Sequence, residues 1–189
     1  MNILYIHQYF STPQQSSALR SYNISMSMLK SGHQVTMVTA SKDSNAKSVS
    51  RCNVDGIDVI YVNNPYSQYF SKIKKVWSFV KFVYKSIKVA SKEKDVDVVY
   101  ATSTPLTVGF VALFLHWYKG WKYVFEVRDL WPEFPIQVGA IRNKAVIWLL
   151  RKLEKKIYDK AEHVVALSPG MVEGVLKTGQ PQSKVSMIP

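Results

Sequence analysis

Short apolar runs alternate along the chain with segments in which apolar residues recur every three or four positions. Short runs are typical of strands and periodic segments of helices. The expected strands cover residues 3–7, 34–40, 98–101, 122–127, 163–167 and 184–188. A hairpin is expected over residues 47–63, because Asp55-Gly56 separates two alternating segments. The expected helices cover residues 17–30, 71–92 and 143–159, with two more that begin at Ser103-Thr104-Pro105 and at Ser168-Pro169-Gly170.

Strands that alternate with helices, several of them almost continuously apolar, indicate βαβ units. Such units build a parallel sheet with helices on both faces. We therefore expect one α/β, Rossmann-like domain over residues 1–189. Ligands of such sheets bind beyond the carboxyl ends of the strands. The loops after the strands that end near residues 7, 101, 127 and 167 are consequently the places to look for chemistry.

Composition narrows the class of protein. Hydrophobic residues make up 47% of the 189 residues, which is enough for a sizeable core. The single cysteine, Cys52, excludes an internal disulfide framework and a cysteine-based zinc site, and it fits a reducing compartment. The amino terminus has no basic, cleavable leader, and the longest apolar stretch, residues 106–117, is too short to span a bilayer. We expect an intracellular protein without metal.

The positive charge of the chain is concentrated in two of the expected helices. The formal net charge is +12, to which residues 71–94 contribute +7 and residues 142–160 contribute +5. In the first helix we expect an inward apolar face, made of Ile73, Val76, Trp77, Val80, Val83, Tyr84 and Ile87. The residues expected to face an anionic membrane are Lys74, Phe79, Lys81, Phe82, Lys85 and Lys88. A solvated surface helix with extra core contacts explains this pattern equally well.

The second basic helix shows the same division. Its inward residues are expected to be Val146, Leu149, Leu150, Leu153 and Ile157. Nucleic acid is a possible partner for the same lysines, but arginine is scarce and no nucleic-acid-binding motif is present. The second functional class that remains open is therefore a non-catalytic basic module that binds nucleic acid or anionic lipid.

The first loop lacks the glycines of dinucleotide-binding and P-loop motifs. Small residues at Ser16, Ser17 and Ala18 nevertheless begin a helix whose free N–H groups suit an anion. An ordinary serine N-cap is the alternative interpretation. His7 precedes this loop and is a weaker candidate.

The loop over residues 125–135 combines three acids, an arginine, a tryptophan and two prolines at the end of an expected strand. Carboxylates accept hydrogen bonds from sugar hydroxyls, arginine pairs with phosphate, and Trp131 suits a sugar face. The alternative is structural, with Arg128 paired to Asp129 or Glu133 and Trp131 in the core. Its location favours a functional loop.

Four ordered segments resemble the amino-terminal half of family 4 glycosyltransferases, most closely those of bacterial O-antigen and capsular polysaccharide synthesis. They are residues 3–10, 31–36, 127–133 and 165–171. The resemblance implies half of a GT-B fold, with a carboxyl-terminal nucleotide-sugar-binding domain absent from this chain, which is then inactive alone. It also implies metal-independent, cofactor-free, retaining transfer from a nucleotide-sugar. The implied acceptor is a sugar on a polyprenyl diphosphate at the inner face of the plasma membrane.

The resemblance also implies roles for individual residues. Asp129, helped by Glu133, would act in catalysis. The acceptor would contact His7, Thr104, Arg128 and Trp131, and the donor diphosphate would lie near Ser16, Ser17 and Arg20. The family has a Gly-Gly pair where Ser17 and Ala18 stand, and many members have histidine at Arg128. Whether Asp129 or Arg128 contacts the reacting hydroxyl stays open.

Overall fold

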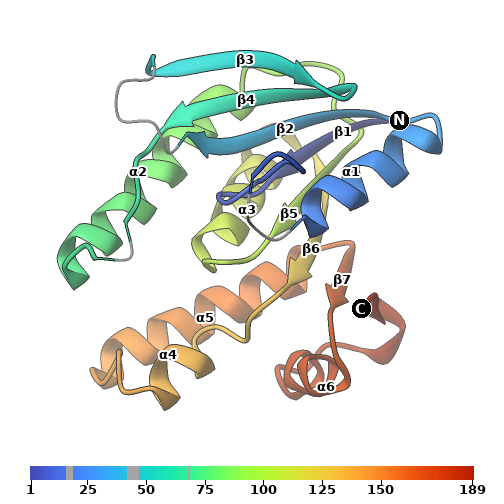
Figure 1. The fold of residues 1–189 in the computed structure, drawn as a ribbon. Coiled ribbons are helices and arrows are strands. Elements are labelled where there is room, and N and C mark those ends of the chain that lie inside the picture. Colours follow the sequence, from blue (N-terminus) through green and yellow to red (C-terminus); the bar gives the residue numbers. More distant parts are fainter. Residues whose placement is uncertain (16–18, 42–46, 68) are drawn as a thin grey trace. The chain divides into compact units, whose positions relative to one another are not determined.

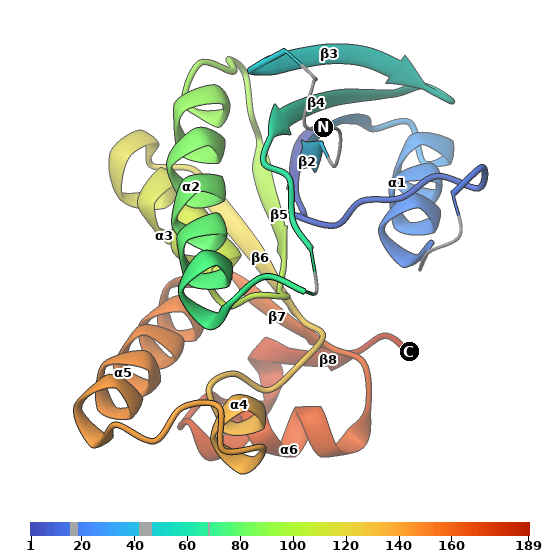
Figure 2. The same ribbon diagram turned by 60° about the vertical axis from the view of Figure 1, so that its left-hand side comes forward.

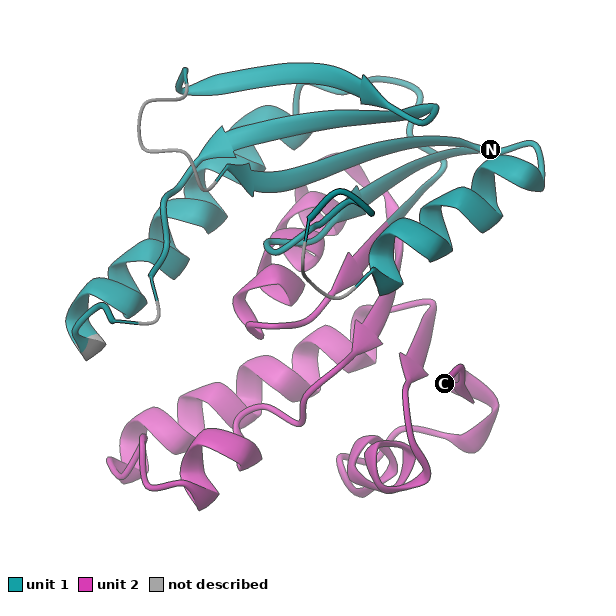
Figure 3. Ribbon diagram, in the orientation of Figure 1, with its two compact units in different colours: residues 1–99 teal, residues 100–189 magenta. Residues whose placement is uncertain are grey.

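The computed structural model describes residues 1–15, 19–41, 47–67 and 69–189 of the chain. These residues form two compact units, residues 1–99 and residues 100–189 (Figure 3). Both are α/β, as the alternation of apolar patterns predicted, and eight strands are present in the described part of the chain.

The first unit is a sheet with a helix on either face. Its elements are β1 (Asn2–Ile6), α1 (Arg20–Lys30), β2 (Gln34–Ser41), β3 (Val49–Val54), β4 (Ile57–Asn63) and α2 (Lys72–Ala90) (Figure 1). The strand order is β3-β4-β2-β1. Strands β1, β2 and β4 are parallel, and β3 pairs with β4 in the antiparallel sense. Helices α1 and α2 lie on opposite sides of the sheet (Figure 2).

The second unit continues the same alternation. Its elements are β5 (Val98–Thr102, which begins in the first unit), α3 (Thr107–Lys119), β6 (Lys122–Val127), α4 (Glu133–Gln137), α5 (Lys144–Lys160), β7 (His163–Ala166), α6 (Pro169–Lys177) and β8 (Val185–Met187). The strand order is β5-β6-β7-β8, and β6, β7 and β8 are parallel. Helices α3 and α5 pack together on β6, and α6 packs on β7 and β8.

The close packing of α3 against α5 and β6 depends on a glycine. A Cβ atom placed on Gly109 would lie 2.8 Å from Ile157 Cδ1 and 2.8 Å from Phe125 Cε2. Ile157 and Phe125 are fully buried. The absent side chain therefore lets the helix approach the sheet closely.

The predicted elements are confirmed, except that the short helix α4 and a 3-10 turn (Gln182–Lys184) were not foreseen. In the predicted hairpin turn, Asp55 and Gly56 have positive φ angles of 51° and 92°, which aspartate and glycine tolerate. Ser168 caps α6 as expected and accepts a hydrogen bond from the Met171 N–H. The predicted cap at Ser103-Thr104 is wrong, because α3 begins at Thr107 without a side-chain cap.

The predicted inward face of α2 is also wrong. Ile73, Trp77 and Tyr84 are exposed by 83%, 59% and 67%. The buried side of the helix instead consists of Ser78, Phe82, Ser86 and Ala90. The side of the helix that packs on β2 and β4 thus combines one large apolar residue with small ones, which allow close contact with the sheet. In α5 the predicted inward residues Val146 and Leu149 are exposed, whereas Ile157 is buried as predicted.

Replacing Gly109 with alanine should lower the free energy of unfolding by about 1–3 kcal/mol, because the added methyl group overpacks a rigid core. Urea unfolding measures the effect. Gly170→Ala is the matched control, since a Cβ at this helical glycine meets no atom within 4 Å. It should leave stability unchanged or raise it by up to about 1 kcal/mol. Equal effects of both changes would contradict the packing argument.

Candidate active site

The carboxyl ends of β5 and β6 bring two of the predicted loops together. Thr104 Oγ1 donates a hydrogen bond to Asp129 Oδ2 at 2.8 Å. Ser103 Oγ accepts from the Arg128 N–H at 2.9 Å, and the Ser103 N–H donates to the Glu126 carbonyl at 2.8 Å. These three bonds fasten the loop after β6 to the loop after β5. The side chains of Ser103 and Thr104 thus form hydrogen bonds to the loop after β6 and do not cap a helix.

The strand ends beneath these loops are held by buried polar groups. Thr102 Oγ1 donates to Glu126 Oε2 at 2.7 Å, and both side chains are fully buried. A buried carboxylate is costly unless it is hydrogen-bonded, so this contact fixes the two strands at the depth of the loops. The site therefore lies at the carboxyl ends of two strands that this hydrogen bond holds together.

Asp129 has the geometry of a group that can bind a hydroxyl. It is half-buried, and Thr104 occupies only Oδ2. Within the described ranges no hydrogen bond to Asp129 Oδ1 is present, which leaves that oxygen to accept a substrate proton. Arg128 and Trp131 are also half-buried. The arrangement suits orientation or deprotonation of a hydroxyl group.

Glu133 points to a different partner. Its Oε1 accepts from Arg151 Nη2 at 2.8 Å and from Arg151 Nε at 3.0 Å, an ion pair between α4 and α5. The predicted help to Asp129 therefore has no contact to support it. Of the structural alternatives for this loop, the pairing of Arg128 with Glu133 is wrong, because Glu133 pairs with Arg151.

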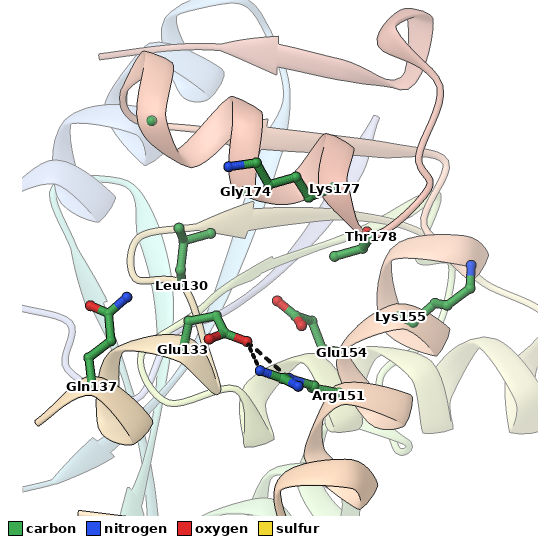
Figure 4. A pocket seen from close by; sticks show the side chains of 10 residues that line it. Leu130, Glu133, Gln137, Arg151, Glu154, Lys155, Gly174, Lys177 and Thr178 are labelled. Atoms are coloured by element: carbon green, nitrogen blue, oxygen red, sulfur yellow. Dashed lines mark hydrogen bonds and ion pairs between the residues drawn. The ribbon is translucent and has the colours of Figure 1, made fainter. Parts of the chain in front are cut away.

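Glu133 and Arg151 line a pocket of about 520 Å³ that α4, α5 and α6 surround (Figure 4). The other side chains at its wall include Leu130, Glu154 and Lys177. Glu154 is buried, accepts a hydrogen bond from Tyr158 Oη at 3.1 Å, and has its pKa raised to about 7 by burial. Glu154 is a residue of this pocket that was not predicted from the sequence. Its signal was a charged residue between Leu153 and Ile157 on the side of the helix that packs inward.

The first loop is only partly described. Ser16 and Ser17 lie outside the described residues, and Arg20 is the half-buried first residue of α1. His7 is buried, and its Nδ1 lies 2.9 Å from Ser21 Oγ. The adjacent Gln8 side chain is buried with neither amide atom hydrogen-bonded to a described residue. The polar side chains at the end of β1 are therefore only partly hydrogen-bonded.

The predicted membrane-facing residues divide into two groups. Lys74, Lys81 and Lys88 are exposed, as expected. Phe82 is fully buried, so its assignment to a membrane surface is wrong. Phe79 is half-buried and stacks on Tyr66.

The remaining member of the predicted set, Lys85, is half-buried and donates to the Asn63 carbonyl. The apolar residues that α2 does expose form one stripe, hereafter the apolar stripe: Ile73, Val76, Trp77, Val80 and Tyr84.

Within the described ranges, no helix is long and apolar enough to cross a membrane. The same residues contain no group of three or more His, Cys, Asp or Glu side chains placed to hold a metal ion.

Comparison with known proteins gives one family and a set of similar folds. Residues 18–189 match the family described as "Glycosyl transferase 4-like domain". A probable glycosyltransferase, WbjE of Pseudomonas aeruginosa, is 29% identical over 93 residues, which are 49% of this chain and 23% of that protein.

Two solved structures illustrate the fold. Sucrose-phosphate synthase from Thermosynechococcus elongatus superimposes with a TM-score of 0.70 at 16% identity, over 100% of this chain and 47% of that chain. Anabaena Alr3699/HepE in complex with UDP and glucose has a TM-score of 0.57 at 15% identity, over 98% of this chain and 43% of that chain. The chain thus spans less than half the length of these matched proteins.

The raised pKa of Glu154 predicts a pH-dependent stability. The usual pKa of a glutamate side chain is 4.5, and the pKa of Glu154 in the folded chain is about 7. Between these two pH values the unfolded chain has lost a proton that the folded chain keeps. The free energy of unfolding should therefore fall as the pH rises through this window. Glu154→Gln should be more stable than the wild type by about 1–3 kcal/mol at pH 8 and nearly equal to it at pH 4.5.

Urea unfolding at the two pH values measures this difference. Glu173→Gln is the control, because Glu173 is an exposed acid on α6. It should leave the pH dependence of the wild type unchanged. An unchanged pH dependence in Glu154→Gln would show that the carboxyl group is not held in its protonated form.

Proposed function

Since the chain belongs to the family of glycosyl transferase 4-like domains, we propose that it is the acceptor-side domain of a retaining glycosyltransferase. The enzyme moves a sugar from a nucleotide-sugar to a lipid-linked glycan in surface polysaccharide synthesis. The observation that supports this role most directly is the Thr104–Asp129 hydrogen bond at the carboxyl ends of β5 and β6. The lipid-linked acceptor rests on the resemblance of the four sequence segments to O-antigen and capsule enzymes.

In this proposal Asp129 binds the reacting hydroxyl of the acceptor. Thr104 holds Oδ2, so Oδ1 accepts the hydroxyl proton as the acceptor oxygen bonds to the anomeric carbon of the donor. The bond between that carbon and the diphosphate breaks, and its electron pair leaves with the nucleoside diphosphate. Arg128 is the alternative contact to the hydroxyl, and Trp131 covers the sugar face.

The donor is proposed to be a nucleotide-sugar. The solved Anabaena structure of similar fold contains UDP and glucose, which makes a uridine nucleotide the first donor to test. Ser16, Ser17 and Arg20 precede or begin α1, where free N–H groups and the helix dipole favour a diphosphate. The carboxyl-terminal nucleotide-sugar-binding domain that the resemblance implies supplies the other donor contacts. The proposed transfer needs no metal or cofactor.

We also propose that the enzyme works at the cytoplasmic face of an anionic membrane. The apolar stripe of α2 is flanked by Lys74, Lys81 and Lys88, so apolar and cationic side chains share one exposed side of the helix. Such a helix inserts its apolar side chains at the acyl boundary while lysines contact phosphates. A lipid-linked acceptor is reached from the same surface.

Asp129→Asn in the complete gene product should lower the transfer rate at least a hundredfold, because the amide cannot take a proton. Thr104→Val should lower it less, since it frees Asp129 without removing it. Release of nucleoside diphosphate, measured with a membrane extract as acceptor, gives the rates. Glu173→Gln, a surface acid on α6, is the control. Normal transfer by Asp129→Asn would exclude the catalytic role.

Membrane binding is tested by the triple change Ile73→Ser, Val76→Ser, Val80→Ser, which spares the buried side of α2. Binding of the chain to vesicles that contain phosphatidylglycerol should fall at least tenfold, because the buried apolar area is lost. Co-sedimentation measures it.

Val49→Ser is the matched control, since Val49 is an exposed apolar residue on β3. It should bind vesicles like the wild type. Equal binding of the triple variant would overturn the membrane proposal, and strong, salt-sensitive binding of duplex DNA would favour the basic binding module instead.

A further inference from the structure

The pocket that α4, α5 and α6 surround lies in the second unit, and the proposed transfer chemistry gives it no role (Figure 4). One wall consists of Leu130 and two glycines of α6, Gly170 and Gly174. A Cβ atom on Gly174 would lie 2.6 Å from Leu130 Cδ1, whereas one on Gly170 would meet no atom within 4 Å. Gly174 therefore lets Leu130 pack on α6, and Gly170 leaves space open at the first turn of the helix.

Glu154 of α5 is a buried acid that faces this pocket. Its exposed fraction is only 6%, and Figure 4 shows its carboxyl group pointing into the pocket. Its Oε1 accepts a hydrogen bond from Tyr158 Oη at 3.1 Å. Within the described ranges, Oε2 accepts no hydrogen bond. One oxygen of a nearly buried carboxyl group is therefore available to a ligand.

The cations that line the pocket are directed to other groups. Arg151 donates through Nη2 and Nε to Glu133 Oε1, at 2.8 and 3.0 Å. Lys155 Nζ lies 3.0 Å from Asp159 Oδ1. The remaining cation, Lys177, is exposed on α6, and its side chain points away from Glu154 (Figure 4). An ionised Glu154 is consequently left without a cation in direct contact.

The surroundings of Glu154 favour a ligand that brings positive charge. Burial raises the pKa of Glu154 to about 7 against the opposing hydrogen bond from Tyr158, and the Glu133 carboxylate adds to the rise. Arg151 lowers this pKa by the smallest contribution, because its guanidinium is paired with Glu133. An entering cation would compensate the buried negative charge, whereas an entering anion would meet two carboxyl groups.

We propose that this pocket binds a primary ammonium compound, whose ammonium group pairs with Glu154 and whose short apolar chain lies against Leu130 and the glycines of α6. An ammonium group supplies positive charge together with N–H donors, and the open Oε2 atom can accept one of them. When the carboxyl group is protonated, its proton leaves to solvent as the ammonium group binds. This site is separate from the Thr104–Asp129 pair, and its test does not depend on sugar transfer.

NMR titration of the ¹⁵N-labelled chain with n-butylammonium tests the proposal at the site itself. The amide signals of Gly170 and Gly174 should shift as the ligand binds. The ligand stays charged at pH 5.5 and at pH 8.5, because alkylammonium groups such as that of lysine titrate near pH 10.4. With a pKa of about 7, Glu154 is roughly 3% ionised at pH 5.5 and almost fully ionised at pH 8.5. The Kd should therefore be about thirtyfold smaller at pH 8.5.

Three other ligands separate charge, donors and apolar contact. Butanol keeps the apolar chain without the charge, tetramethylammonium keeps the charge without N–H donors, and butyrate reverses the charge. Each should bind at least tenfold more weakly than n-butylammonium at pH 8.5. Equal binding of butanol would reduce the site to an apolar hollow, and tighter binding of butyrate would make it an anion site. Either result would overturn the proposal.

Glu154→Gln should weaken n-butylammonium binding at least tenfold at pH 8.5 and abolish its pH dependence. The matched control is Glu173→Gln, since Glu173 is an exposed acid of α6 that does not line the pocket. It should change the Kd less than twofold. Equal weakening by the two changes would show attraction to general negative charge and would contradict the assignment.

Tyr158→Phe gives a readout that a purely structural role of Glu154 would not move. The change removes the hydrogen bond that favours the ionised carboxyl group, so the midpoint of the pH dependence of binding should shift to higher pH. An unshifted midpoint in this variant would show that another group titrates, and the role of Glu154 would be wrong.

Discussion

The hydrogen bond from Thr104 to Asp129 joins two loops that are 25 residues apart in sequence, and the candidate site depends on it. Parallel strands end at the same edge of a sheet, but the loops that follow them need polar contacts to keep a fixed distance. Here those contacts are short side chains of the β5–α3 loop, Ser103 and Thr104, which meet the backbone of Arg128 and the side chain of Asp129. The buried pair Thr102–Glu126 supports them from below.

The sequence predicted the order and type of the elements because period-two and period-3.6 apolar patterns are local properties of the chain. It placed Asp129, Arg128 and Thr104 in loops that follow strands for the same reason. The direct Thr104–Asp129 contact was not predictable, since a serine or threonine before a proline signals a helix cap equally well. Glu133 was predicted to help Asp129, but it pairs with Arg151. This pairing was not predictable, because no local pattern specifies how the helix that carries Arg151 is rotated about its axis.

Helix α2 shows why its inward side could not be read from periodicity. The large apolar side chains follow the helical repeat, and they therefore suggested the core side of the helix. The sheet instead receives Ser78, Ser86 and Ala90 around Phe82, because small residues allow a close helix–sheet contact. The large apolar side chains are left exposed beside lysines. The chemistry of the two units therefore differs: carboxylate and hydroxyl groups near β6, ammonium and aromatic groups near β4.

The apolar stripe also has a consequence for the protein in water without lipid. Two molecules can cover this surface by placing their α2 helices against each other, which brings two sets of unpaired lysines close together. Their repulsion extends over about one Debye length, roughly 8 Å at physiological ionic strength, and weakens as salt is added. Salt therefore acts in opposite senses on the two kinds of contact: it loosens attachment to an anionic bilayer and promotes pairing of one copy with another.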